Sequence, residues 1–408
     1  MKQLFIAIAE GAALLALAIG LFLVVFLVVP VATVVYVAFT EKGGGEFTLI
    51  NFLDFVRTEL FVRSFWNSVY VSAMTVLWSS AFALPLAYLT TRFEFRGAML
   101  VHTLGFLPLI MPPFVGAVAM QLLFGRNGTV NLLLDEHFDF KIGFMEGLNG
   151  VIFLQAIHYF PFILVNLSAA LRNIDRAMEE AAQNLGSHGL RLFRRIAFPL
   201  ALPGYVAGAS LVFVKVFDDV ASPLLLNVKE MLAPQAYLRI TSIGIDDPIG
   251  YVASVIMVIA SIIALWGSTW VMRGRDYATQ QRGGSSLAKR ELKPWQAVLA
   301  YGWIILVLIV VLSPHLGILL LSFSKVWSYS VVPDVYTLDN YVTVFRDSSG
   351  MMVNTLLYCG LAAGADVLLG TAIAYLILRT KLAGRQWLDF VATGAIAIPG
   401  VVLGIGYL

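Results

Sequence analysis

Four charged side chains interrupt apolar stretches of this sequence, and they are the residues best placed to do chemistry. Lys215, Asp218 and Asp219 lie close together in one apolar run, and Asp366 lies in another. A charge inside a membrane-spanning helix is energetically expensive, so each is a functional hypothesis by default. Two interpretations stay open. Lys215 forms a local ion pair with one of the two aspartates at helical spacing, or one carboxylate lines a path for a cationic solute.

No motif predicts catalysis in this chain. The sequence lacks G-x-x-x-x-G-K-[ST], H-E-x-x-H and G-x-S-x-G, its five histidines are scattered, and Cys359 is its single cysteine. We therefore expect no catalytic residue, no metal site, no disulfide and no cofactor bound by this chain. Nucleic-acid binding is not expected either, because the basic residues form short blocks beside apolar runs, as membrane topology requires.

The composition predicts an all-α polytopic membrane protein. Hydrophobic residues make up 59% of the chain and charged residues 13%, and the mean hydropathy is +0.85. A spanning helix needs about 20 apolar residues, and continuous apolar runs favour helices over barrel strands. The predicted spans are 11–39, 66–91, 99–124, 150–171, 204–226, 249–272, 295–323, 353–378 and 388–408. The first exceeds a signal peptide in length and is expected to remain as a span.

One hydrophilic stretch, residues 172–203, separates two of these runs and must project into water. Residues 179–182 favour helix, Gly186 permits a left-handed turn, and residues 190–195 resume a short helix, so we predict a small helix-turn-helix. Four apolar side chains are expected to pack back on the membrane part: Leu185, Leu192, Phe193 and Ile196. The alternative is a solvated amphipathic loop without a partner.

The residue order in this stretch resembles the EAA signature of permease subunits in binding-protein-dependent ABC importers. Glu180-Ala181-Ala182 is followed by Gly186, Ile196, Pro199 and Leu202-Pro203 at the family's spacing. The resemblance implies the type I ABC importer permease fold and a cytoplasmic loop that docks on an ATPase subunit. The residues implied in this coupling are Glu179, Glu180, Ala181, Ala182, Gly186, Ile196, Pro199 and Pro203. It also implies two partners, an ATPase dimer that binds ATP and Mg, and a periplasmic or extracellular solute-binding protein.

The charge distribution predicts the orientation in a bacterial inner membrane. If the loop at 172–203 is cytoplasmic, the segments on that side carry more Lys and Arg than those on the other side. This is the bias of the positive-inside rule, and it predicts a cytoplasmic N-terminus.

The sequence repeats itself, which predicts two tandem, parallel permease halves. Pairs at one constant separation are Asn67 and Asn354, Arg92 and Arg379, Gly97 and Gly384, and Pro112 and Pro399. We predict a first half at 1–272 with six spans, a cytoplasmic linker at 273–294 that is flexible, and the start of a second half at 295–408 with three spans. Because no second EAA-like loop follows, the second half is expected to be truncated.

Proline positions and the fused halves lead to the remaining hypotheses. Residues 107–116 hold three prolines, among them Pro112, and predict a broken third span that lines the pore; ordinary kinking is the alternative. The stretch FDDVASPLLL resembles the corresponding segment of ferric-iron, polyamine and related permeases. The fused halves resemble most the ferric-iron branch, which implies Fe(III) as the substrate. 2-Aminoethylphosphonate, a polyamine or thiamine are alternatives, as are two other classes of protein: an ion-coupled secondary transporter and a membrane-embedded enzyme.

Overall fold

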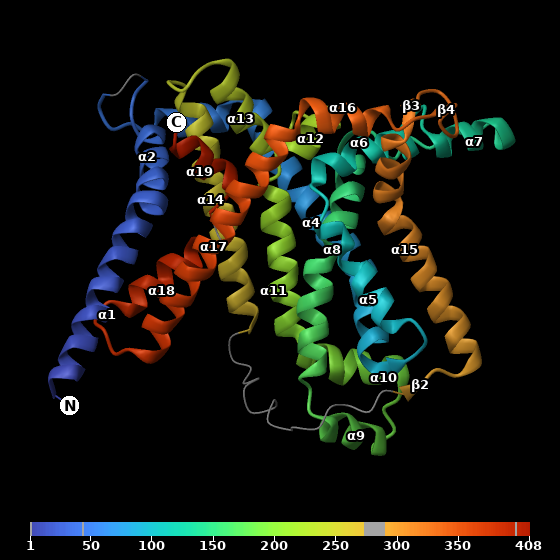
Figure 1. Ribbon diagram of the computed structural model, residues 1–408, viewed down its shortest axis with the longest axis horizontal. Coiled ribbons are helices and arrows are strands. Elements are labelled where there is room, and N and C mark those ends of the chain that lie inside the picture. The colour runs from blue at the N-terminus through green and yellow to red at the C-terminus, as the bar shows by residue number, and fades with distance from the viewer. Residues whose placement is uncertain (1, 43–44, 273–289, 396–397) are drawn as a thin grey trace. The chain divides into compact units, whose positions relative to one another are not determined.

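The computed structural model describes residues 2–42, 45–272, 290–395 and 398–408, and its elements are almost all helices (Figure 1). In chain order they are α1 (Lys2–Leu23), the π-helix η1 (Val24–Val28), α2 (Val29–Ala38), α3 (Ile50–Arg57), α4 (Glu59–Arg92), β1 (Phe93–Glu94), α5 (Ala98–Phe106), the 3-10 helix η2 (Leu107–Leu109), α6 (Pro113–Phe124), α7 (Thr129–Phe138), α8 (Gly147–Arg172), α9 (Arg176–Asn184), α10 (Gly189–Leu192), the π-helix η3 (Phe193–Ala197), α11 (Phe198–Phe217), α12 (Ala221–Leu225), α13 (Leu232–Ser242), α14 (Pro248–Met272), β2 (Arg290–Glu291), α15 (Pro294–Ser322), β3 (Ser324–Val326), β4 (Val335–Tyr336), α16 (Asp339–Asp347), α17 (Ser349–Arg379), α18 (Arg385–Gly394) and α19 (Gly400–Gly406).

Seven helices of the described residues are long and apolar enough to cross a membrane. They are Gly11–Ala38, Glu59–Arg92, Gly147–Arg172, Gly189–Phe217, Pro248–Met272, Pro294–Ser322 and Ser349–Arg379. Each corresponds to a predicted span, so the prediction of a polytopic helical protein is confirmed.

Two predicted spans are not continuous helices. The third is broken between Ala98–Leu109 and Pro113–Phe138, which meet at 101°. Pro112 and Pro113 lack the amide hydrogens that would carry the helix through this point. The predicted span 388–408 is divided between α18 and α19, and Pro399 is the N-cap of α19. The break in the third span agrees with the prediction from its prolines, and its pore-lining role remains a prediction. The span 388–408 was predicted as one continuous run and is divided.

The helices form two compact units, which are described separately. Unit 1 comprises residues 1–58, 236–262 and 336–408, and unit 2 comprises 59–235 and 263–335. The units draw on both predicted halves, because α15 lies with the elements of 59–235 and α17 lies with the elements of 1–58. The division into halves at 1–272 and 295–408 remains a prediction.

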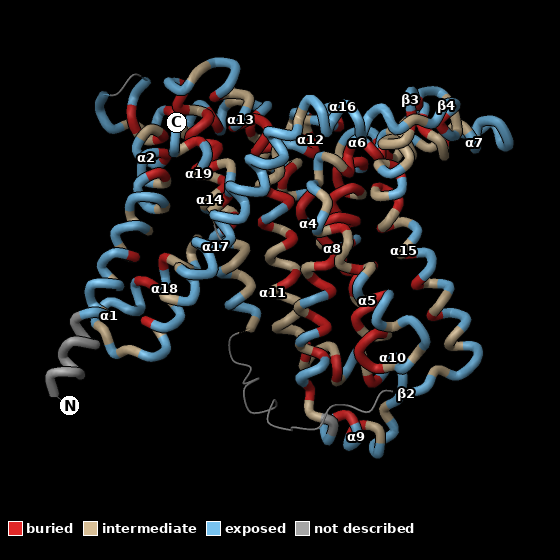
Figure 2. Tube along the Cα trace, in the orientation of Figure 1, coloured by how far each residue is buried: buried red, intermediate tan, exposed pale blue. Residues whose placement is uncertain are grey.

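Unit 2 is built on α4, α8 and α11, where buried residues are concentrated (Figure 2). The backbones of α8 and α11 approach closely because two glycines face α8. A Cβ at Gly204 would lie 2.4 Å from the Asn166 carbonyl oxygen, and one at Gly208 would lie 2.7 Å from the Ile163 Cα. Small residues at such spacing are typical of tightly packed membrane helices. α15 packs mainly against α6 of the same unit.

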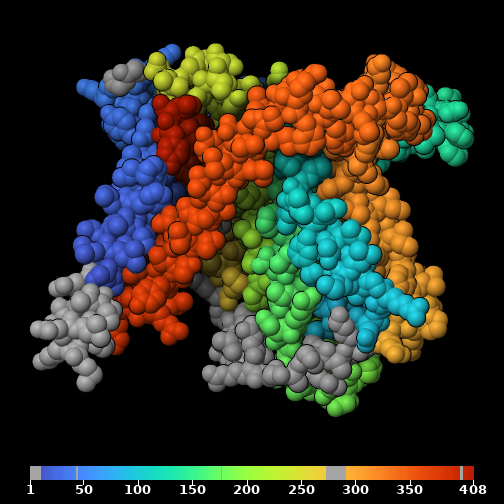
Figure 3. All heavy atoms as spheres, in the orientation of Figure 1, coloured from blue at the N-terminus to red at the C-terminus, as the bar shows by residue number. Residues whose placement is uncertain are grey.

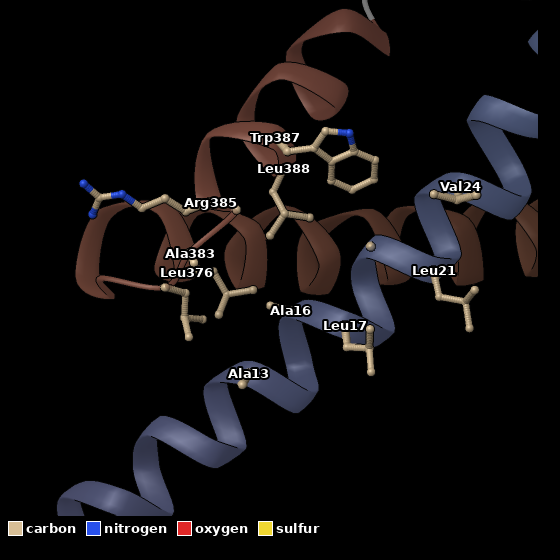
Figure 4. A pocket seen from close by; sticks show the side chains of 13 residues that line it. Ala13, Ala16, Leu17, Leu21, Val24, Leu376, Ala383, Arg385, Trp387 and Leu388 are labelled. Atoms are coloured by element: carbon tan, nitrogen blue, oxygen red, sulfur yellow. The ribbon is translucent and has the colours of Figure 1, made fainter.

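Unit 1 brings α1 and α2 against α17, α18 and α19. A pocket of about 500 Å³ lies between α1 and the turn from α17 to α18, with Leu17, Trp387 and Leu388 among its lining residues (Figure 4). Residues 351–368 of α17 are all exposed, and Figure 3 shows this helix as an uncovered ridge of side chains.

The predicted linker is described only in its last residues. Residues 273–289 lie outside the described part of the chain. Arg290–Glu291 form β2, which pairs in parallel with β1 at the end of α4. The C-terminal end of the segment 273–294 is therefore ordered by backbone pairing, contrary to the expectation of a flexible joint throughout.

Backbone conformations recur at residues that the sequence pairs. Gly97 and Gly384 are left-handed N-caps, with φ of 84° and 88°, of α5 and α18. Pro112 and Pro399 precede α6 and α19 with φ, ψ of −58°, 136° and −57°, 138°. The paired conformations support the duplication, which remains a prediction.

Candidate functional site

The loop at 172–203 folds as a helix, a turn and a second short helix, as the sequence predicts. Asp175 begins α9 as its N-cap, with Oδ1 accepting a hydrogen bond from the Ala177 amide at 2.9 Å. After α9, α10 and η3 lead directly into α11. The predicted shape is confirmed, and α9 lies at one end of unit 2 (Figure 1).

Gly186 ends α9 in a left-handed conformation with φ of 84°. Its amide donates to the Gln183 carbonyl, and the Ser187 amide donates to the Ala182 carbonyl, both at 2.9 Å. This pair of bonds is a Schellman motif, which glycine adopts at low cost because it has no Cβ. Gly186 therefore sets the angle at which the chain leaves α9.

The two faces of α9 differ in character. Glu179 and Ala182 are buried, with 3% and 8% of their surfaces exposed. Glu180 and Ala181 are exposed. α9 thus has one face that packs on its own unit and another that is open to a partner.

Glu179 forms a buried ion pair with Arg92, the last residue of α4. The Arg92 guanidinium nitrogen lies 2.5 Å from Glu179 Oε1, and the two side chains are 6% and 3% exposed. Opposite charges attract strongly where water is excluded, so this ion pair joins α9 to the end of a spanning helix. Sequence reasoning assigned Glu179 to the coupling face and did not identify Arg92 as its partner.

Apolar side chains of the loop divide between the interior and the surface. Leu192 is 2% exposed, and Phe193 packs against the core of the unit, as expected. Ile196 is half-buried in η3. Leu185 is 89% exposed, so the expectation that it packs back is wrong. Because Leu185 follows the last residue of α9 and Gly186 turns the chain at once, its side chain extends outward.

Aromatic rings connect this loop to two spanning helices. The centroid of the Phe193 ring lies 4.8 Å from that of the Tyr88 ring of α4 and 5.7 Å from that of the Phe198 ring. The ring centroids of Phe198 and Tyr205, both on α11, are 5.4 Å apart. The Tyr205 hydroxyl lies 3.0 Å from Ser80 Oγ of α4. Pro199 lies in the first turn of α11 and Pro203 in its interior. The loop is therefore packed against α4 and connected through Phe198 to α11.

The candidate path residues of the fifth span lie at and beyond the end of α11. The helix ends at Phe217, so Asp218 is its C-cap and Asp219 follows it, whereas both were expected within the span. Asp219 Oδ2 accepts from Gln155 Nε2 at 2.8 Å, and its Oδ1 accepts from the amides of Ala221 and Ser222 at 3.1 and 3.3 Å. Asp219 thus joins α8 to the start of α12.

The other candidate path residues are not gathered with Asp219. Lys215 is exposed on the last turn of α11, Asp366 is exposed on α17, and Pro112 is exposed at the start of α6. Asp366 belongs to unit 1 and the other two belong to unit 2. Gln155, buried on α8, is the partner of Asp219 that sequence reasoning missed, and an isolated glutamine in an apolar run was its only signal.

Seven apolar helices of the described residues and an exposed helical loop define a polytopic membrane protein. The chain belongs to the family of binding-protein-dependent transport system inner membrane components, whose family model matches residues 79–277. It is a multi-pass inner membrane protein.

Three permease proteins of other organisms are similar to this chain in sequence. A probable molybdenum ABC transporter permease protein of Haloferax volcanii is 31% identical over 192 residues, which cover 47% of this chain and 69% of that protein. The ferric transport system permease protein FbpB of Actinobacillus pleuropneumoniae is 28% identical over 404 residues, 96% of this chain and 57% of that protein. A putative ferric transport system permease protein of Haemophilus influenzae is also 28% identical, over 96% of this chain and 62% of its own length. The chain spans about three-fifths of these two ferric relatives.

Solved structures share the fold. A bacterial alginate ABC transporter, in complex with an alginate-bound periplasmic protein, matches with a TM-score of 0.53 and 17% identity over 70% of this chain and 98% of that chain. The predicted ABC importer permease fold is confirmed by this likeness and by the family match.

Proposed function

We propose that the complete protein is the membrane-spanning permease of an ATP-driven importer, and that the loop at 172–203 couples it to an ATPase. The observation that supports this proposal most is the difference in exposure between the two faces of α9. Glu179 and Ala182 hold the helix to its own unit, while Glu180, Ala181 and Leu185 are exposed. A free amphipathic loop would not need a buried ion pair to fix its orientation.

The coupling follows from the connections of the loop. Closure of two ATPase subunits around ATP and Mg moves α9, and the buried pair with Arg92 passes the displacement to α4. The Phe193 and Phe198 rings pass it to α11. The small side chain of Ala181 on the exposed face lets the partner approach the helix closely, while Ala182 lets α9 pack closely on its own unit. The pore then changes from inward-facing to outward-facing.

We also propose two partner proteins and an orientation of the chain in the membrane. An ATPase dimer binds the loop in the cytoplasm, and a soluble binding protein delivers the solute on the opposite face. The N-terminus then lies in the cytoplasm, in agreement with the distribution of Lys and Arg.

Ferric iron is the substrate that we place first. Relatives described as ferric transport permeases match 96% of the chain. Asp218 and Asp219 place negative charge at the end of α11, which suits a cationic solute better than an oxyanion. 2-Aminoethylphosphonate, a polyamine or thiamine is the alternative cargo, and a relative described as a 2-aminoethylphosphonate permease is 29% identical over 46% of the chain.

Co-purification and uptake test the proposal with the complete protein. An ATPase subunit should co-purify, and Glu180→Lys or Gly186→Asp should abolish uptake while the protein still reaches the membrane. Absence of an ATPase together with unchanged uptake in both variants would favour an ion-coupled transporter. Uptake of labelled Fe(III), measured against labelled 2-aminoethylphosphonate in the same vesicles, decides the substrate.

A further inference from the structure

An apolar groove lies in unit 2 between α4, α10 and α15, next to the loop at 172–203. Its volume is about 440 Å³. Apolar and aromatic side chains from all three elements form its wall, among them Leu84, Tyr88, Leu190, Trp295, Leu299 and Trp303.

The groove lies at the level where a membrane meets water. Leu84 is roughly 12 Å along α4 from its end at Arg92, and Trp303 is roughly 14 Å from the start of α15 at Pro294, at 1.5 Å per residue. The groove therefore covers roughly the terminal quarter of α4 and the terminal third of α15. Trp295 and Trp303 fit this depth, because tryptophan is enriched at membrane interfaces.

Cationic side chains border the groove on its water-facing side. Arg191 and Arg194 are exposed on α10 and η3, next in sequence to the lining residues Leu190 and Phe193. Lys293 is exposed at the start of α15. The acidic side chains nearby are two exposed glutamates on β1 and β2, Glu94 and Glu291. The border thus has an excess of positive charge.

One polar atom in the wall of the groove has no partner. Trp303 Nε1 is buried and donates no hydrogen bond to any of the described residues. An indole N–H is a donor only, and rotation of the Trp303 ring toward the groove would let a carbonyl or phosphate oxygen there accept from it.

We infer that this groove binds one anionic phospholipid, with an acyl chain along α4 and α15 and its phosphate beside Arg191 and Lys293. A lipid chain is slender enough to fit the groove, and the surrounding bilayer supplies it. The phosphate matches the cationic border, and an ester carbonyl oxygen matches Trp303 Nε1.

Fluorescence quenching tests the inference with the complete protein in vesicles. Brominated phosphatidylglycerol should quench the tryptophans more strongly than brominated phosphatidylcholine at equal mole fraction. Lys293→Gln and Arg191→Gln should each lower the preference for phosphatidylglycerol about fivefold, since a basic residue near the membrane surface contributes about 1 kcal/mol to anionic-lipid association. The double variant Trp295→Phe/Trp303→Phe should remove the excess quenching.

A matched control is available on another lipid-exposed helix. Trp266 is 58% exposed on α14, and Trp266→Phe should leave the excess quenching unchanged. Equal quenching by the two brominated lipids would overturn the inference, as would an excess that persists in the double tryptophan variant. Loss of quenching by both lipids at Trp295 and Trp303 when a co-purified ATPase is added would assign the groove to a protein partner instead.

Discussion

The buried pair of Arg92 and Glu179 gives the sharpest prediction about the coupling loop. Glu179→Ala leaves the Arg92 guanidinium without its carboxylate at a site where the two side chains are 6% and 3% exposed. Removing one partner of a buried ion pair costs about 3–5 kcal/mol. Because α9 has nine residues and few other buried side chains, we expect this cost to appear as local opening of α9.

Hydrogen–deuterium exchange of the α9 amides measures this opening. Glu179→Ala and Arg92→Ala should each speed exchange roughly 10²–10⁴-fold, up to the limit set by unfolding of the whole unit. The double variant Arg92→Met/Glu179→Met should exchange almost as slowly as the unsubstituted protein, because an apolar pair of similar size has no charge to solvate.

A neighbouring carboxylate provides the control for this experiment. Glu180 is exposed on the same helix, and Glu180→Gln should leave the α9 exchange rates unchanged. If Glu179→Ala also leaves them unchanged, or if the effects of the two single alanine variants simply add in Arg92→Ala/Glu179→Ala, the pair does not hold α9 and the reasoning fails.

Three further predictions concern single residues. The Cβ of Gly186→Ala would meet no atom within 4 Å, but alanine would have to adopt the left-handed conformation of Gly186. The variant should therefore destabilise the end of α9 by about 1–2 kcal/mol, and Gly186→Asn should destabilise it by less. Equal hydrogen-exchange rates at the Ser187 amide in the two variants would contradict this. Gly208→Ala should lower the thermal unfolding temperature, because its Cβ would lie 2.7 Å from the Ile163 Cα. Gly302→Ala, whose Cβ would meet no atom within 4 Å, should not lower it. Equal unfolding temperatures of the two variants would refute the close packing of α8 and α11. Asp219→Asn keeps an oxygen that accepts from the Ala221 and Ser222 amides, so it should preserve folding but reduce uptake of a cationic solute. Asp219→Ala should also lose about 1 kcal/mol of capping energy. Normal uptake by Asp219→Asn would exclude the carboxylate from the path.

Local features of the fold were predictable from the sequence because short-range chemistry decides them. Gly186 ends α9 and Pro112 precedes α6 for reasons that lie in single residues and their neighbours. The long spans follow in the same way from apolar length. The break at Pro112 was predicted from the prolines around it. The break before Pro399 shows the limit of apolar length as a rule, because a hydropathy window averages over a single missing amide hydrogen.

Contacts between distant segments were not predictable in the same way. Arg92 and Glu179 lie in different hydrophilic segments, and nothing in either segment identifies the other as its partner. The recurrence of arginine at 92 and 379 was a signal that this position matters, without indicating its contact. Leu185 was placed on the wrong side of the loop, since the left-handed turn at Gly186 determines its direction more than its hydrophobicity does.

Cysteine cross-linking tests the central claim most directly. In a background with Cys359→Ser, which replaces the one cysteine of this sequence, and with any cysteine elsewhere in the complete protein also replaced by serine, Leu185→Cys should cross-link to the ATPase subunit. It should react with thiol reagents only from the cytoplasmic side. Lys229→Cys, exposed in the segment after α12, should react only from the opposite side and form no such cross-link. Labelling of Leu185→Cys from the periplasmic side, or failure to cross-link to an ATPase that co-purifies, would contradict the account.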